Sequence, residues 1–200
     1  MSRPEEKLKE HYTYADYLKW DDDVYYELID GVPDPLPTPL RDHQILLGGL
    51  FHQFADFLDD KHQDVFGLLS AVRLNASGLD DDVFLPDLFV ISDRSKYDEN
   101  SYNGSPDLII EILGNNTAHK DRYIKYHKYL KAKVLEYWIV DPYVRSVETF
   151  ILNDNKYKFH IYDAEEKVAV SVIDGLIIDM KLVFDKIKLY NIEGKNVNTS

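Results

Sequence analysis

Residues 106–113 read PDLIIEIL, and this stretch decides how the rest of the chain is interpreted. A short apolar run rich in β-branched residues favours a buried strand. Side chains alternate across a strand, so Glu111 shares one face with Ile109 and Leu113. A carboxylate in an apolar setting is costly unless it meets a cation or a hydrogen-bond donor. The strand therefore predicts a partner for Glu111 elsewhere in the chain.

A second acid stands in a similar setting in PDLFVIS, residues 86–92, where Asp87 shares a face with Phe89 and Ile91. Two neighbouring carboxylates need a cation or a proton between them. A divalent metal with oxygen ligands meets that need, and Mg²⁺ often takes one or two protein carboxylates. Asp87 and Glu111 are thus candidate metal ligands. Two alternatives stay open at this point: Asp87 caps a turn after a proline, or Glu111 lies on a wet face or pairs with Arg73 or Lys125.

A polar segment follows the strand and is expected to be a helix over about 118–131, capped by Asn115, Asn116 or Thr117. Asp121, Lys125 and Lys128 fall on one face of such a helix, at i, i+4 and i+7. These side chains form either a solvated stripe or a functional face. In the functional case Lys125 reaches back toward Glu111 and stabilises charge on a reacting phosphate.

Outward from this stretch, the pattern alternates between strands and a few helices. A short helix is expected at 12–20, and a strand, a turn at Asp30-Gly31 and a proline-rich loop at 25–39. Asp42 is expected to cap a helix through Leu58. Further strands are expected at 68–76, 83–92, 106–113, 134–142, 147–152, 157–163 and 168–173. Strands on both sides of a helix predict an α/β or α+β fold, with a mixed central β-sheet flanked by helices.

The bulk composition limits the functions that the chain can have. It has 200 residues, is 44% hydrophobic, contains no cysteine and carries a formal charge of −13. These values predict one domain over 12–190 between flexible ends at 1–11 and 191–200. The absence of cysteine excludes disulfides and thiolate metal sites, and with the polar start of the chain it favours a cytoplasmic protein with no membrane span. The acidic charge counts against tight DNA binding without a metal ion.

The order of several short motifs resembles a known family. The motifs are YELIDGVP at 26–33, DHQ at 42–44, PDLFVISD at 86–93, PDLIIEIL at 106–113, DRYIKYHKY at 121–129 and LEYWIVDP at 135–142. Together they resemble the Uma-two type of restriction endonuclease, often catalogued as a domain of unknown function within the PD-(D/E)XK nuclease superfamily. The resemblance covers nearly the whole chain and implies a restriction-endonuclease-like fold.

The resemblance also implies roles for individual residues. Asp87 matches the first acid of the superfamily and Glu111 the second, so both would hold the metal. The usual lysine would fall at Leu113, and in this branch its place on the following helix matches Lys125. Glu27 matches a family acid that serves as an outer metal or water ligand, and His43 matches a family histidine expected to contact substrate. The chain departs from the family at residues 114–117, which read GNNT instead of a Ser-Pro-Ser-Thr-like turn.

These residues imply a DNA endonuclease that depends on Mg²⁺ or Mn²⁺ and hydrolyses phosphodiester bonds. Asp87, Glu111, Lys125 and Glu27 would be its catalytic residues, and DNA would be its partner, bound weakly without metal. A homodimer is expected because nucleases that cut both strands often pair across a two-fold axis. The alternative is a nuclease fold that no longer cuts and acts as a binding module.

Overall fold

A mixed six-stranded sheet forms the centre of the protein in the computed structural model, which describes residues 10–20, 24–67, 69–114 and 116–187. The strand order is β11-β10-β9-β8-β6-β3. The parallel pair β8 and β9 is joined by a helical crossover, and the other neighbours are antiparallel. The strands are Asp64–Gly67 (β3), Leu88–Ile91 (β6), Leu108–Ile112 (β8), Glu136–Asp141 (β9), Ser146–Asn153 (β10) and Lys156–Asp163 (β11).

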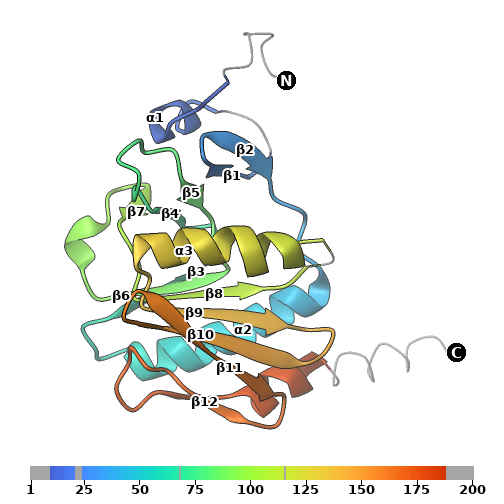
Figure 1. Cartoon of the computed structure of the whole chain (residues 1–200). Helices are drawn as coiled ribbons and strands as arrows, with labels where there is room; N and C mark the ends of the chain where they lie inside the picture. The colour runs from blue at the N-terminus through green and yellow to red at the C-terminus, as the bar shows by residue number, and fades with distance from the viewer. Residues whose placement is uncertain (1–9, 21–23, 68, 115, 188–200) are drawn as a thin grey trace, which may run out of the picture.

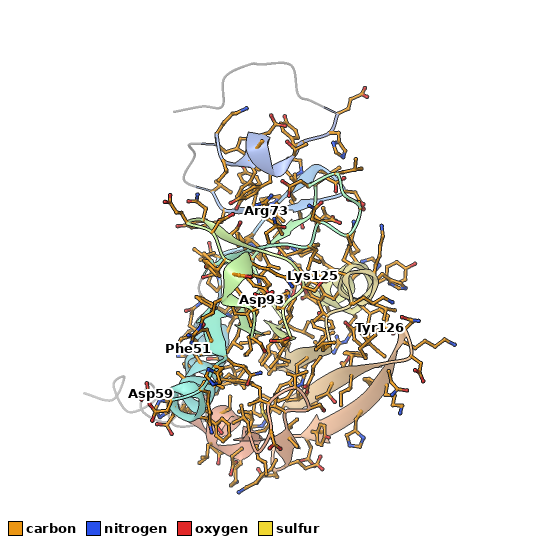
Figure 2. All side chains as sticks on the ribbon, turned by 90° about the vertical axis from the view of Figure 1, so that its left-hand side faces the viewer. Phe51, Asp59, Arg73, Asp93, Lys125 and Tyr126 are labelled. Carbon is orange, nitrogen blue, oxygen red and sulfur yellow. The ribbon has the colours of Figure 1, made fainter. Side chains whose placement is uncertain are left out.

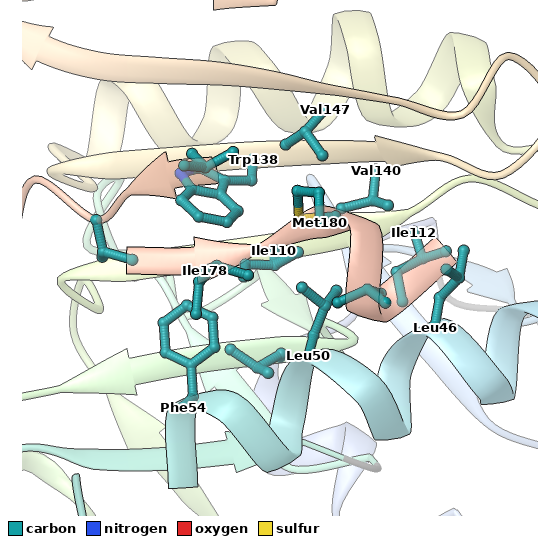
Figure 3. Packing of buried hydrophobic residues seen from close by; sticks show 14 of the residues in the cluster. Leu46, Leu50, Phe54, Ile110, Ile112, Trp138, Val140, Val147, Ile178 and Met180 are labelled. Carbon is teal, nitrogen blue, oxygen red and sulfur yellow. The ribbon is translucent and has the colours of Figure 1, made fainter. Parts of the chain in front are cut away.

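One face of this sheet is covered by the long helix α2, Arg41–Leu58. Leu46, Leu50 and Phe54 recur at helical spacing and are fully buried against the sheet. Figure 3 shows them packed under Ile110 and Trp138 of the central strands. The sequence prediction for the start of this helix was wrong by two positions: Leu40 is the N-cap, and the predicted cap Asp42 lies inside the first turn.

The other face is covered by helix α3 and by a second sheet, which the sequence did not predict (Figure 1). The order of this sheet is β2-β1-β5-β4-β7. Its strands are Tyr26–Ile29 (β1), Val32–Pro35 (β2), Ala71–Arg73 (β4), Val83–Phe84 (β5) and Ser101–Asn103 (β7). The short helix α1, Tyr14–Tyr17, packs beside it, with Thr13 in a capping box with Asp16.

The single strand predicted over 83–92 is in fact two strands that belong to different sheets. β5 ends at Phe84 and β6 begins at Leu88. Pro86 stands between them, and a proline has no N–H with which to continue a ladder. The chain therefore leaves the small sheet and enters the central one directly after Asp87, which puts this acid at the junction of the two sheets.

The crossover helix also differs from the prediction of one regular helix over about 118–131. It starts with a π-helical turn, Lys120–Lys125 (η2), and continues as α3, Tyr126–Ala132. It ends where Lys133 adopts a left-handed φ of 65°. The N-cap is His119, with no side-chain cap bond. Of the predicted caps, Asn115 lies outside the described residues, and Thr117 accepts a bond from the Gly114 N–H.

A hairpin of Lys167–Ala169 (β12) and Ile177–Asp179 (β13) closes the molecule next to α2. The predicted strand over 168–173 is thus only three residues long, and Ser171 and Val172 lie in the loop that follows. The predicted flexible ends lie almost wholly outside the described residues. Within the residues that are described, no helix combines the length and apolarity needed to cross a bilayer.

Candidate active site

Asp87 and Glu111 lie close together at one end of the β6–β8 pair. Asp87 directly precedes β6, whose first residue Leu88 pairs with Ile110, and Glu111 is the next residue of β8. The charge of Asp87 contributes to the raised pKa of Glu111, and both residues line the same cleft. The two acids therefore share one location.

Asp87 is held by two donors from different elements. Its Oδ2 accepts a hydrogen bond of 2.6 Å from the Ile112 N–H, which fixes it to the end of β8. Its Oδ1 lies 3.0 Å from Nε2 of His43, in the first turn of α2. Nδ1 of His43 is buried and has no hydrogen-bond partner among the described residues. The structure thus places His43 against Asp87, with its second ring nitrogen still able to bond.

Lys125 lies at the centre of the acidic groups and is only 2% exposed. Its Nζ is 2.8 Å from Glu111 Oε1 and 2.7 Å from Glu27 Oε1, with Asp121 Oδ1 at 3.7 Å. Figure 2 shows it in the interior, below the small sheet and above the central strands. The π-helical turn ends at Lys125. Such turns are frequent at functional sites, and this one directs a helical lysine into the sheet junction.

Glu27 is fully buried, and both of its oxygens are engaged. Oε1 accepts from the Leu85 N–H at 3.1 Å as well as from Lys125, and Oε2 accepts from Lys120 Nζ at 3.0 Å. Lys120 also bonds Asp34 at 2.9 Å. In this arrangement Glu27 binds two lysines and holds Lys125 in position beside Glu111.

Two residues that the sequence reasoning missed complete the surroundings of Glu111. The Tyr129 hydroxyl donates to Glu111 Oε1 at 2.7 Å, and Lys120 joins the network through Glu27. Tyr129 follows Lys125 by four residues, so helical spacing could have identified it. Lys120 could not be found that way, because its partners come from strands of the second sheet.

Burial and neighbouring charges shift the pKa values of both Glu111 and Lys125. Burial raises the pKa of Glu111 to about 8, Lys125 opposes that shift, and Asp121, Asp87 and Glu27 add to it. Burial alone would lower the pKa of Lys125, but Glu111, Glu27 and Asp121 raise it well above its ordinary value. Lys125 therefore stays charged, and burial makes ionisation of Glu111 costly even beside it.

The groups line a cleft of about 980 Å³ between the two sheets and the start of α2. Its wall contains His43, Asp87, Glu111 and Lys125. Of the residues that the resemblance singled out, Glu27 alone is not part of this wall and lies behind Lys125.

The donor chemistry of this wall fits Mg²⁺ or Mn²⁺. Both cations prefer oxygen ligands, and Mg²⁺ typically takes one or two carboxylates and completes its shell with water and phosphate oxygens. Asp87 and Glu111 provide two carboxylates in the same wall. The described residues hold no group of three or more His, Cys, Asp or Glu side chains placed to bind an ion. Asp87 and Glu111 would therefore hold such an ion together with water and phosphate oxygens.

Comparisons with known proteins agree with this fold. A solved structure from Anabaena variabilis ATCC 29413, described as a "putative nuclease belonging to DUF820", superposes with a TM-score of 0.73 at 20% identity. The match covers 88% of this chain and 98% of that one, so the two share a fold. A search of curated proteins found no match.

The family comparison covers most of the chain. The sequence model of the Uma2 family, described as "Putative restriction endonuclease", matches residues 14–181. This range contains Asp87, Glu111, Lys125, Glu27 and His43. The chain therefore belongs to the Uma2 family.

Proposed function

We propose that the protein is a Mg²⁺- or Mn²⁺-dependent endonuclease that hydrolyses phosphodiester bonds in DNA. The observation that carries the proposal is that Asp87 and Glu111 line one cleft, with Lys125 Nζ 2.8 Å from Glu111. Membership of the Uma2 family supports it.

Asp87 and Glu111 would hold the metal ion. A bound divalent ion lowers the pKa of its water and polarises a phosphoryl oxygen. The Ile112 N–H and His43 fix the carboxylate of Asp87, and Tyr129 fixes that of Glu111. Little reorganisation is then needed when charge develops.

Lys125 supplies the fixed positive charge of the site. Its ammonium group lies in a buried wall, where an ion pair is screened far less than at the surface. Glu27 holds it from behind, so Lys125 is oriented toward Glu111 and the cleft. In this position it offsets the negative charge that develops on the phosphate oxygens or orients the attacking water.

The test is strand cleavage of supercoiled plasmid and of single-stranded DNA in Mg²⁺ or Mn²⁺. We expect Asp87→Asn and Glu111→Gln each to lower the rate by about 10²- to 10³-fold, the usual loss for one preorganised electrostatic group. Glu99→Gln, an exposed acid outside the cleft, is the matched control and should keep the wild-type rate. A Glu111→Gln variant that cuts as fast as wild type would remove the assignment.

A second function, a nuclease fold that binds without cutting, is favoured by one observation. The turn after Glu111 reads GNNT and departs from the family pattern. Calorimetric titration with Mn²⁺ separates the two functions: an active nuclease binds the ion, and Asp87→Asn weakens that binding. DNA binding with neither Mn²⁺ binding nor cleavage would establish the binding module instead.

The homodimer and the cytoplasmic location stay predictions. Light scattering over the concentration range of the cleavage assay tests the first. A monomeric mass throughout that range would contradict it.

A further inference from the structure

The cleft has an apolar mouth above its charged wall. Large apolar side chains at the mouth are exposed to solvent and come from separate segments: Val24, Tyr25, Leu40, Leu69 and Tyr143. We call these five residues the apolar rim. Scattered exposed apolar residues need no explanation, but several gathered around one cleft mark a binding surface.

Two of the rim residues are aromatic and strongly exposed. Tyr25 is 58% exposed and directly precedes β1, and Tyr143 is 59% exposed and follows β9. They adjoin strands of the small sheet and the central sheet respectively, and both line the cleft that contains Asp87 and Glu111. Aromatic faces of this kind stack on nucleic-acid bases irrespective of base identity.

The cations of the cleft, by contrast, are already paired. Among the described residues, three lysines and arginines line it, and each lies within 3.1 Å of a carboxylate oxygen; the pairs are Arg41–Asp42, Lys120–Glu27 and Lys125–Glu111. His43 of the same wall lies 3.0 Å from Asp87. The chain as a whole carries a charge of −13. Binding to duplex DNA relies mainly on lysines and arginines that neutralise phosphates on both strands. The wall of this cleft offers little of that attraction.

The burial of Glu111 and Lys125 also favours a single strand over a duplex as the substrate. Glu111 is buried in the wall, and Lys125 is nearly inaccessible. A scissile phosphate must therefore enter below the rim. Nucleotides in a duplex are held by pairing and stacking, and enzymes that act at depth on them pay an unstacking energy or use single strands. A strand with unpaired bases can lower its phosphate into the cleft while its bases stay at the rim.

From these observations we infer that the cleft takes DNA as a single strand, with unpaired bases stacked on Tyr25 and Tyr143 at the apolar rim. This inference rests on the proposed nuclease function and names its substrate class. Affinity comes from base stacking at the rim, and the metal site contacts the phosphate between the stacked bases.

The test is fluorescence anisotropy with labelled oligothymidine, free or paired with oligoadenosine, on the Glu111→Gln variant, in which cutting is slow. We expect the single strand to bind at least about tenfold more tightly than the duplex. Tyr25→Ala and Tyr143→Ala should each weaken single-strand binding by about five- to 150-fold, the effect of losing one stacked base. Tyr25→Phe and Tyr143→Phe keep the ring and should bind like the parent.

Tyr123→Ala is the matched control, because Tyr123 is 60% exposed but lies outside the cleft wall. Equal affinity for duplex and single strand would overturn the inference, as would alanine variants that bind like Tyr123→Ala, or no binding to either DNA. The proposed function fails separately, in the cleavage assay. Duplex cutting that Tyr25→Ala and Tyr143→Ala leave unchanged would keep the nuclease and remove the single-strand inference.

Discussion

The hydroxyl of Tyr129 shows how closely single groups hold the site. It donates to Glu111 Oε1 at 2.7 Å, while its ring packs edge-on against Phe84 and Tyr137. Tyr129→Phe keeps the packing and removes only the donor. We expect it to lower the free energy of unfolding by about 1–2 kcal/mol, because a buried hydrogen bond to a carboxylate is lost. Urea denaturation measures this, and Tyr123→Phe at an exposed position should change stability by less than about 0.5 kcal/mol.

For individual side chains, the sequence predicted some positions correctly and could not predict others. Strand alternation alone predicts that Glu111 shares a face with Ile109, and the structure has this arrangement. Alternation cannot predict that Lys120 contacts Glu27, because β1 and η2 are brought together only by the packing of the second sheet. Whether Asp87, Glu111 and Lys125 have the roles that the family implies stays a prediction for the cleavage assay.

Among the secondary-structure elements, a buried acid outside the site links the central sheet to the C-terminal hairpin. Glu136 of β9 accepts from Trp138 Nε1 at 2.7 Å and from the Val172 N–H at 3.1 Å. Val172 lies in the loop between β12 and β13. Burial raises the pKa of Glu136, and its bonds to Trp138 and to the backbone at Val172 and Ser171 oppose the rise without cancelling it.

The sign of the resulting pH dependence follows from that shift. The folded protein keeps the Glu136 proton at pH values where the unfolded chain has lost it, so stability falls as pH rises from the ordinary glutamate pKa through the raised one. Glu136→Gln cannot titrate and lacks this slope. We therefore expect the stability advantage of wild type over Glu136→Gln to be largest near pH 4 and to shrink toward pH 7 in urea titrations. An advantage that grows with pH would mean that Glu136 is stabilised as the anion.

Hydrophobic periodicity predicted the long helix α2 correctly but missed some short strands. The spacing of Leu46, Leu50 and Phe54 predicted α2 to within two residues of its start. The strands β3 and β7 were missed because four and three residues give too little alternation to recognise. The two-sheet division at Pro86 and the π-helical turn of η2 depend on tertiary packing, which no local pattern records.

The net negative charge of the chain and the paired cations of the cleft together predict how DNA affinity depends on salt concentration. Each phosphate that a protein neutralises on a single strand contributes about −0.7 to the slope of log affinity against log salt concentration. The chain carries 36 acidic and 23 basic side chains, and the cations that line the cleft are engaged by carboxylates. Few counterions should therefore be released on binding, and affinity should come mainly from stacking.

We expect a slope between about −0.7 and −1.4 for oligothymidine with the Glu111→Gln variant, which corresponds to one or two phosphates. The measurement is fluorescence anisotropy from about 50 to 200 mM NaCl, the range over which electrostatic binders lose most affinity. Tyr25→Ala should weaken binding at every salt concentration and leave the slope unchanged, because a stacked base releases no counterions. A slope steeper than about −4 would reveal six or more phosphate contacts and place the main DNA-binding surface outside the cleft, on a basic track that the acidic average of the chain conceals.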